Sequence, residues 1–490
     1  MNNSSEKLSL STKLGYGAGD IFGGGAMTII GFYYLYFLTD IVKISPALAG
    51  LAFLISKIWD AVSDPLMGMI SDQTRTRFGR RRPYFLAGII LIFLSFFLMW
   101  FPVDFSREMH RFIYVCCAYI FFSTVITMVM VPYNALASEL TVDYNERTSL
   151  ATFRMVFSGI SGILCATVPL EVVRGFDDVR TGYMVMAVCF GLFFALPYIG
   201  TFFTTFERKE FQREIAHRRF SETITFTFIE PFKVRSFRHV MMMYIFSFLT
   251  IDSVMAIVIY FMTYYIGRPD QLTPLLATLF IMQIVFLPIS DILSKKTSKR
   301  TVFMGSVILW MLALIYSFIV GPDSPLLFLY LFGAVLGIAS AGNNVTIFAM
   351  FPDIPDIDEL KTGERREGIY SGLFTFMRKA SSAIALFLIS GAIHLAGYLP
   401  PVEQKVAGAV KMIPQEQSDT FIIILRLIFA LAPMIFLAVA LINCIRYPLS
   451  PMLHERLRTL LSRKRGGEST TEMIDEEKEL KGILIGTDER

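Results

Sequence analysis

Long apolar stretches without charge alternate with short polar segments along almost the whole chain. Residues 21–39, 86–103, 303–320 and 427–445 contain no charged side chain, and each approaches the roughly 20 residues that a helix needs to cross a bilayer. Backbone groups that face lipid must satisfy their hydrogen bonds within their own segment, so these stretches are predicted to be helices. The sequence lacks the short alternating segments that are typical of a membrane β-barrel.

The lengths of the apolar stretches predict about twelve membrane-spanning helices. Their expected ranges are 13–42, 47–70, 83–103, 110–134, 150–172, 182–206, 239–266, 272–293, 301–320, 326–350, 368–398 and 420–446. The predicted fold class is therefore an all-α transmembrane protein.

The longest polar segment inside the chain, 207–238, divides the predicted helices six and six. We expect an N-terminal half over 1–206, a cytoplasmic central loop over 207–238, a C-terminal half over 239–446 and a cytoplasmic tail over 447–490. The tail is polar, with a basic cluster before an acidic stretch, and is predicted to be disordered. Acidic and basic residues recur after corresponding helices of the two halves, as in transporters built from two repeats.

Basic residues gather in alternate loops and predict the side of the membrane that each loop faces. The loop 75–82 carries five arginines, whereas the loop before it carries only Lys43. Because basic loops stay in the cytoplasm, both termini are expected there, with the protein in the inner (plasma) membrane. The net charge of +4 is spread over many loops, so we attribute it to topology and expect no nucleic-acid partner.

Three charged side chains share one face of the second predicted helix. Lys57, Asp60 and Asp64 are spaced i, i+3 and i+7, and Ser63 lies close to the same face. Two carboxylates about 6 Å apart repel each other by roughly 3 kcal/mol at an effective dielectric constant near 20. Lys57, a proton or a bound cation must offset this repulsion. The spacing fits a static Asp–Lys–Asp bridge that holds helices together, and it equally fits an oxygen site for Na⁺ or H⁺.

Five further charged residues fall at membrane depth, where such groups usually face a cavity or an opposite charge. They are Asp20, Arg154, Asp252, Lys379 and Arg426. Asp20 needs a basic partner, which Arg154 or Lys379 could supply, and such a group suits a polyhydroxylated ligand. For Asp252 and Arg426 we favour structural pairing.

Two further patterns lie beside these charges. Thr127, Met130 and Asn134 share one face of the fourth predicted helix. Such a stripe is ordinarily core packing, and it gains a functional meaning only if it meets the second helix. Six glycines surround Asp20 between residues 15 and 25, and we interpret them as positions where helices approach closely.

Four longer motifs are spread over nearly the whole chain. They read KIWDAVSDPLMG, SDQTRTRFGRRRPY, VPYNALASELTVDYNERTSLATFR and PDIPDIDELKTGERREGIYSGLFTFMRK. Together they resemble the glycoside–pentoside–hexuronide:cation symporters, the melibiose permease family within the major facilitators. The resemblance implies two six-helix pseudo-repeat halves and symport of a sugar with a cation by alternating access.

The same resemblance implies a cation site at Asp60, Ser63, Asp64 and Thr127. The coupling ion would be Na⁺ or H⁺, with Na⁺ held at Asp60 and Asp64, and no other cofactor is expected. The melibiose permease has an asparagine where this chain has Ser63. An oxygen ligand survives this change, but the preference for Na⁺ does not follow.

For the substrate, the resemblance implies a sugar site at Asp20, Arg154 and Lys379, with Met130 and Asn134 beside it. The melibiose permease has an aspartate at the position of Met130 and a tryptophan at that of Asn134. These differences argue against galactoside recognition and fit members that take glucuronides, pentosides or oligosaccharides. We expect a small-molecule sugar or glycoside, a coupling cation and the lipid bilayer as partners of a monomer.

Charged residues near the cytoplasmic helix ends are predicted to form a gate that breaks on opening. Its expected members are Asp72, Arg80, Arg81, Arg147 and Arg365. The alternative is that these charges only set the membrane topology.

Three other functions were weighed against sugar symport. A lysolipid or amphiphile symporter would use the same scaffold, and a sensor would bind sugar without moving it. An enzyme is not expected, because the sequence contains no GxxxxGK[ST] phosphate loop, no GxSxG motif and no HExxH motif.

Overall fold

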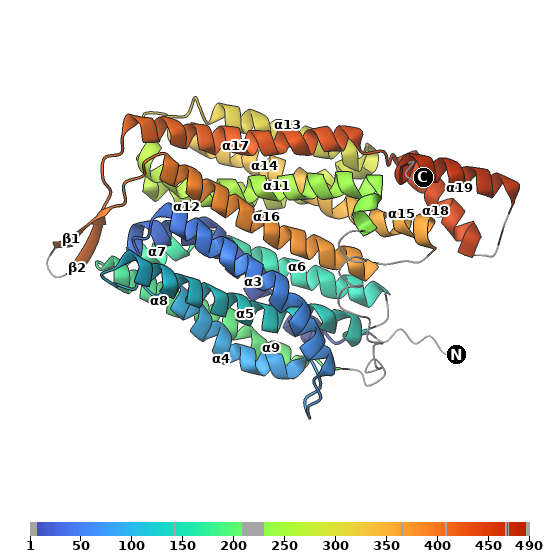
Figure 1. Ribbon diagram of the computed structural model, residues 1–490, viewed down its shortest axis with the longest axis horizontal. Helices are drawn as coiled ribbons and strands as arrows, with labels where there is room; N and C mark the ends of the chain where they lie inside the picture. The colour runs from blue at the N-terminus through green and yellow to red at the C-terminus, as the bar shows by residue number, and fades with distance from the viewer. Residues whose placement is uncertain are drawn as a thin grey trace. The chain divides into compact units, whose positions relative to one another are not determined.

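The structure is a computed structural model of the chain. It describes residues 7–141, 144–207, 230–363, 367–406, 409–465, 468 and 470–486. The chain forms two compact units, each assembled from separate stretches of sequence (Figure 1). The first unit comprises 1–215, 255–277 and 386–425, and the second comprises 216–254, 278–385 and 426–490.

The first unit contains most of the N-terminal helices and a small hairpin. Its elements are α1 (Leu10–Ala18), α2 (Asp20–Ile29), the π-helical turns η1 (Ile30–Tyr34) and η2 (Phe37–Ile41), α3 (Pro46–Gln73), α4 (Arg82–Met99), α5 (Glu108–Leu140), α6 (Tyr144–Thr167), α7 (Pro169–Arg174), α8 (Val179–Ala195), α9 (Pro197–Thr204), η6 (Phe261–Tyr265), η7 (Pro269–Gln271), β1 (Val402–Val406) and β2 (Ala409–Ile413). The two strands pair antiparallel, with Val402 opposite Ile413.

The second unit contains most of the C-terminal helices. Its elements are η5 (Glu230–Lys233), α13 (Lys299–Tyr316), α14 (Leu326–Met350), α15 (Asp353–Thr362), α18 (Pro451–Arg465) and α19 (Thr471–Leu484). Four longer helices contribute residues to both units: α11 (Arg235–Tyr260), α12 (Leu272–Lys296), α16 (Glu367–Leu395) and α17 (Asp419–Arg446).

The predicted membrane helices are present in the structure. Eleven helices of the described chain are long and apolar enough to cross a membrane. The remaining predicted helix, 13–42, is divided into α1, α2, η1 and η2, and short π-helical turns of this kind often occur at functional sites. The prediction of an all-α transmembrane protein is confirmed.

Helix α3 shows how the bilayer inverts the usual arrangement of apolar and polar side chains. Ile58, Val62 and Ile70 are more than half exposed on this helix, as expected for side chains that meet lipid. Asp60 and Ser63 are buried instead, at 2% and 8% exposure. The polar face of α3 therefore points into the protein.

Two of the glycines around Asp20 allow α2 to lie directly against α6. A Cβ atom added to Gly24 would lie 2.0 Å from the Ser158 hydroxyl oxygen, and one added to Gly25 would lie 2.1 Å from that of Ser161. Neither contact would tolerate a larger residue without a shift of the helices. The predicted packing role of these glycines is confirmed.

The prediction of a disordered tail over 447–490 is wrong for most of its described residues. This segment forms α18 and α19, which lie beside α15 in the second unit (Figure 1). Leu457, Leu480 and Leu484 are fully buried there. The prediction of disorder rested on the high charge of the tail. The tail is also amphipathic, because its leucines recur at helical spacing and form an apolar face. Most of the predicted central loop, 208–229, lies outside the described residues.

Candidate functional site

Polar side chains on α3 meet polar side chains on α5 along the buried face of both helices. The Ser56 and Ser123 hydroxyls lie 2.6 Å apart. Farther along the helices, the Thr127 hydroxyl donates a hydrogen bond of 2.6 Å to Asp64 Oδ1. Thr127 is 2% exposed. Thr127, the first residue of the predicted stripe on α5, thus meets the charged face of α3.

Within α3, the Lys57 ammonium donates a hydrogen bond of 2.9 Å to Asp60 Oδ2. Both side chains are buried, with side-chain exposures of 8% and 2%. The Ser63 hydroxyl turns back toward the carbonyl of Asp60, 3.5 Å away. The structure therefore brings the four residues of the expected cation site into one region of the α3–α5 interface.

This region gathers one basic and two acidic side chains. Lys57 supplies one positive charge against the carboxylates of Asp60 and Asp64, so the three side chains carry one net negative charge. Carboxylate, hydroxyl and carbonyl oxygens are the ligands that hard cations prefer. No group of three or more His, Cys, Asp or Glu side chains forms a metal site among the described residues. A metal ion bound to the two acids would therefore need hydroxyl or carbonyl oxygens as further ligands.

The second predicted site starts from an ion pair between α2 and α6. Arg154 Nε lies 3.0 Å from Asp20 Oδ1, so Arg154 is the partner that Asp20 required. The Arg154 guanidinium also lies over the ring of Tyr133, 5.4 Å from its centroid. Tyr133 stacks on Tyr16 with a centroid distance of 4.7 Å. The Asp20 side chain is 9% exposed and that of Arg154 is 35% exposed, which leaves the guanidinium accessible to a ligand.

The other three residues of the expected substrate site, Met130, Asn134 and Lys379, do not share one environment. Met130 Sδ accepts a hydrogen bond of 3.3 Å from the Tyr198 hydroxyl, and a Cβ atom added to Gly23 would lie 2.5 Å from Met130 Cε. Asn134 is exposed on α5. Lys379 belongs to the second unit, and its role in a substrate site stays a prediction.

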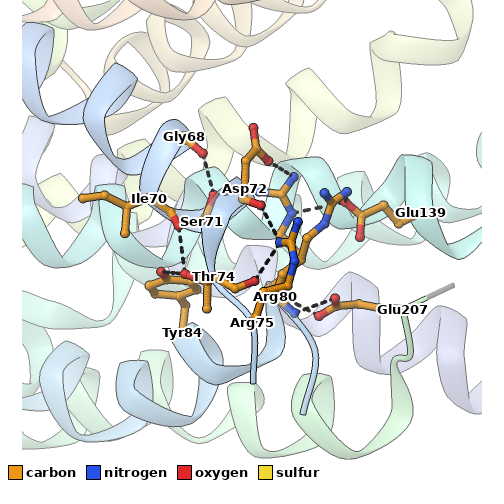
Figure 2. A network of polar contacts seen from close by, with 11 residues as sticks. Gly68, Ile70, Ser71, Asp72, Thr74, Arg75, Arg80, Tyr84, Glu139 and Glu207 are labelled. Carbon is orange, nitrogen blue, oxygen red and sulfur yellow. Dashed lines mark hydrogen bonds and ion pairs between the residues drawn. The ribbon is translucent and has the colours of Figure 1, made fainter. Parts of the chain in front are cut away.

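Figure 2 shows a network of polar contacts at the end of α3, where two predicted gate residues share one acid. Arg80 Nη2 lies 2.6 Å and Arg81 Nε lies 3.2 Å from Glu139 Oε1 on α5. Arg81 also donates hydrogen bonds of 2.5 Å to Asp72 Oδ1 and 2.6 Å to the Ser71 hydroxyl. Asp72, Arg80 and Arg81 therefore join the ends of α3 and α5.

Glu207 completes this network, and the sequence analysis missed it (Figure 2). Its carboxylate accepts backbone hydrogen bonds from Arg80, Arg81 and Arg82 at 2.7, 2.8 and 3.0 Å. An acid at this position satisfies free amide groups at the start of α4 and opposes the positive end of the helix dipole. Gly79 precedes this turn at φ +107°, with Glu207 directly where a Cβ atom would be. Nothing in the local sequence links residues this far apart.

The last two predicted gate residues are not placed in this network. Arg147 Nε donates to the Thr141 carbonyl oxygen at 2.9 Å. Arg365 lies outside the described residues.

Two other charged residues at membrane depth have structural partners, as the sequence indicated. Asp252 accepts two hydrogen bonds from Arg378, at 2.5 and 2.9 Å. Arg426 donates to the Phe318 carbonyl oxygen at 2.9 Å.

Asp40, at the end of the first predicted span, is a buried acid that the sequence analysis did not single out. It is completely buried. Its carboxylate accepts hydrogen bonds from the hydroxyls of Thr39, Tyr264 and Tyr398 at 2.5, 2.9 and 2.7 Å. Thr39 in turn lies 2.6 Å from the Tyr260 hydroxyl. These bonds join η2 to η6 and to the chain after α16, all within the first unit.

Comparison with curated proteins finds relatives that match along most of the chain. A protein named uncharacterized symporter sll1374, from Synechocystis, is 28% identical, with 94% of this chain and 97% of that protein covered. YagG of Escherichia coli, which carries a provisional name as a glycoside/cation symporter, is 26% identical over 94% of this chain and 97% of its own length. The sodium-dependent lysophosphatidylcholine symporter 1 of Gallus gallus is 23% identical over 81% and 80%.

Solved structures show the same fold at low sequence identity. The D323A variant of the nucleoside transporter NupG superposes with a TM-score of 0.58 at 12% identity, covering 89% of this chain and 98% of that one. The inward-open xylose transporter XylE of Escherichia coli gives 0.54 at 14% identity, covering 86% and 94%. The family model described as MFS/sugar transport protein matches residues 15–451. This chain is therefore a multi-pass membrane transporter with the major facilitator fold, and it belongs to the MFS/sugar transport protein family.

Proposed function

We propose that this protein carries a sugar or glycoside across the inner membrane together with a cation, by alternating access. The observation that carries the proposal is the α3–α5 interface, where a hydroxyl of one helix binds a carboxylate of the other. Thr127 donates to Asp64 there, one helical turn from the buried Asp60. The names of the relatives as symporters support coupling to an ion, and the family description supports a sugar substrate.

The cation would bind at Asp60 and Asp64, with the Ser63 and Thr127 hydroxyls as further oxygen ligands. A positive ion at this position would lower the repulsion between the two acids. Lys57 offsets the charge of Asp60 through its 2.9 Å contact. We propose Na⁺ or H⁺ as the ion that binds beside this pair.

The substrate would bind beside Asp20 and Arg154. The charged pair can donate to and accept from sugar hydroxyls, and charge-assisted hydrogen bonds are stronger than neutral ones. Tyr16 and Tyr133 form a stacked pair next to the guanidinium. Lys379 remains a further candidate contact for the substrate.

For the orientation in the membrane, we propose that both termini face the cytoplasm.

Helix α5 offers a physical connection between the two proposed sites. Thr127 on this helix binds Asp64, Met130 packs against Gly23 near Asp20, and Tyr133 lies under Arg154. A cation that changes the position of Thr127 would act on residues one and two turns further along the same helix. Coupling of this kind typically changes each ligand's affinity by 1–3 kcal/mol.

Uptake by proteoliposomes under an imposed Na⁺ or pH gradient tests the proposal. Asp60→Asn and Asp64→Asn should each abolish gradient-driven uptake of the glycoside, whereas Asp291→Asn should not, because Asp291 is half exposed and paired with Lys295. Normal coupled uptake by both site variants would overturn the cation-site assignment.

A lysolipid substrate is the second candidate, and two observations favour testing it. One relative is named as a lysophosphatidylcholine symporter, and the apolar Met130 lines the region near Asp20. Parallel uptake of radiolabelled glycosides and lysophosphatidylcholine in the same vesicles separates the two. Saturable, gradient-driven uptake of only the lysolipid would replace the sugar assignment.

A further inference from the structure

A large open cavity lies in the second unit, and none of the residues of the proposed transport sites lines it. Its volume is about 1030 Å³, at the upper end of the range for small-molecule sites. The start of α13, the end of α12, the chain before α18 and one face of α18 line it. These elements lie on the side that the basic loops predict to be cytoplasmic.

The cavity is basic. Five cationic side chains line it against two carboxylates, Asp353 and Glu455. The cations are Lys295, Lys299, Arg300, Arg458 and Arg463. An anion is therefore the expected kind of ligand.

Three of the five cations are already occupied by acids. Lys299 lies 2.7 Å from Asp353, while Lys295 pairs with Asp291 and Arg463 with Glu468, each on the exposed surface. These pairs leave the two remaining arginines as the cations that can recognise a ligand.

Arg300 and Arg458 have no carboxylate partner among the described residues. Arg300 donates one hydrogen bond from Nη2 to the Ile445 carbonyl oxygen, at 2.5 Å, and its buried Nε has no partner within the described chain. Arg458 takes part in no ion pair with the part of the chain that the structure describes. A guanidinium presents paired N–H groups that match the geometry of a phosphate group.

The start of helix α13 adds further donors on the cavity wall. Ser298 caps this helix by accepting a hydrogen bond of 3.0 Å from the Thr301 amide, and both residues line the cavity. The first amide groups of a helix lack partners within it and carry a partial positive charge, so they attract anions. The hydroxyls of Thr297, Ser450, Thr459 and Ser462 also line the cavity.

We propose that this cavity binds a phosphate group, recognised by Arg300, Arg458 and the N-terminus of α13. The phosphate belongs either to the headgroup of an anionic phospholipid or to a soluble phosphorylated metabolite. Because α18 contributes one wall, an occupied cavity holds the C-terminal helices against α13. The proposal does not depend on the transport sites.

Binding to the full-length protein in lipid nanodiscs tests the proposal with two arms. In phosphatidylcholine nanodiscs, titration calorimetry with inorganic phosphate and glucose 6-phosphate probes a soluble source. In the second arm, the melting temperature is compared between nanodiscs of phosphatidylcholine alone and nanodiscs that also contain phosphatidylglycerol. Saturable binding in the first arm identifies the soluble source, and a rise of the melting temperature in the second identifies the lipid.

Variants on α18 link either signal to the cavity. Arg458→Gln should weaken binding about tenfold, or remove the stabilisation by phosphatidylglycerol, because it deletes a charge-assisted contact. Arg456→Gln is the matched control, since Arg456 pairs with Glu476 and Glu479 rather than lining the cavity.

If Arg458→Gln does not fold, Ser462→Asp replaces it, because this exposed lining residue would place a negative charge beside the ligand. Ser462→Asp should weaken binding in the arm that gave the wild-type signal. No signal in either arm with the wild-type protein overturns the proposal. Equal signals in the wild type and in the folded cavity variant overturn it as well.

Discussion

Thr127 on α5 donates a hydrogen bond of 2.6 Å to Asp64 on α3, and this contact helps to join the polar faces of two membrane helices. Thr127 is buried at 2% exposure, so water does not compete for the bond. Asp64 thereby receives a neutral donor, while Asp60 receives the ammonium of Lys57. The two acids of α3 therefore have chemically different donors among their contacts.

Replacing Thr127 by valine tests the role of this hydroxyl. Thr127→Val keeps the shape of the side chain but removes a donor to a charged group, and it should raise the cation concentration for half-maximal uptake about tenfold. Thr127→Ser retains the hydroxyl and should stay near the wild-type value. Uptake measured against Na⁺ concentration and against pH gives the result. If the valine and serine variants reach half-maximal uptake at the same cation concentration, Thr127 is not a ligand of the cation.

Lys57→Gln distinguishes a cation site from a static ion bridge. Removing one partner of a buried pair costs about 3–5 kcal/mol, because the other charge stays buried. If an ion can bind at Asp60 and Asp64, added Na⁺ or a lower pH should restore most of the lost stability. The melting temperature of the purified variant, measured with and without Na⁺ at several pH values, reports this. A loss that neither condition restores would indicate the static bridge.

Glu139, the acid that Arg80 and Arg81 share, should be a position where substitution strongly lowers the stability of the protein. Glu139→Gln weakens the contacts to both Arg80 and Arg81, whose side chains are 8% and 7% exposed, so we expect a loss of several kcal/mol of stability. Glu171→Gln is the control, because its pair with Arg174 is exposed and should contribute at most about 1 kcal/mol. Thermal unfolding in detergent compares the two variants. Equal melting temperatures would show that the network adds no stability.

Asp40→Ala should destabilise the first unit, because the hydroxyls of Thr39, Tyr264 and Tyr398 lose a shared acceptor. Each buried donor left without a partner costs about 1–3 kcal/mol. Tyr398→Phe removes one of the three donors to Asp40 and should cost clearly less. Melting temperatures of both variants give the ranking. An Asp40→Ala protein as stable as the wild type would show that other groups or water satisfy these hydroxyls.

Much of the membrane architecture was predictable from residue type alone. Helix α3 was expected over 47–70 and spans Pro46–Gln73, since a run of apolar residues in lipid has few alternatives to a helix. The spacing of Lys57, Asp60 and Asp64 also predicted that they share one face of the helix, because an α-helix has 3.6 residues per turn. Arg154 was one of two candidates for Asp20, and only the packing of α2 against α6 chose between them.

The sequence by itself determined the membrane helices, their apolar and polar faces and the acids of α3, because these follow from hydrophobicity and from the local helical period. The tertiary structure alone decided which helices meet. It brought Glu207 onto the backbone of Arg80 and Arg81 across more than 120 residues, gathered the tyrosine hydroxyls around Asp40, and folded the charged tail into helices. Contacts between distant segments depend on the whole packing of side chains, and no local pattern in the chain encodes them.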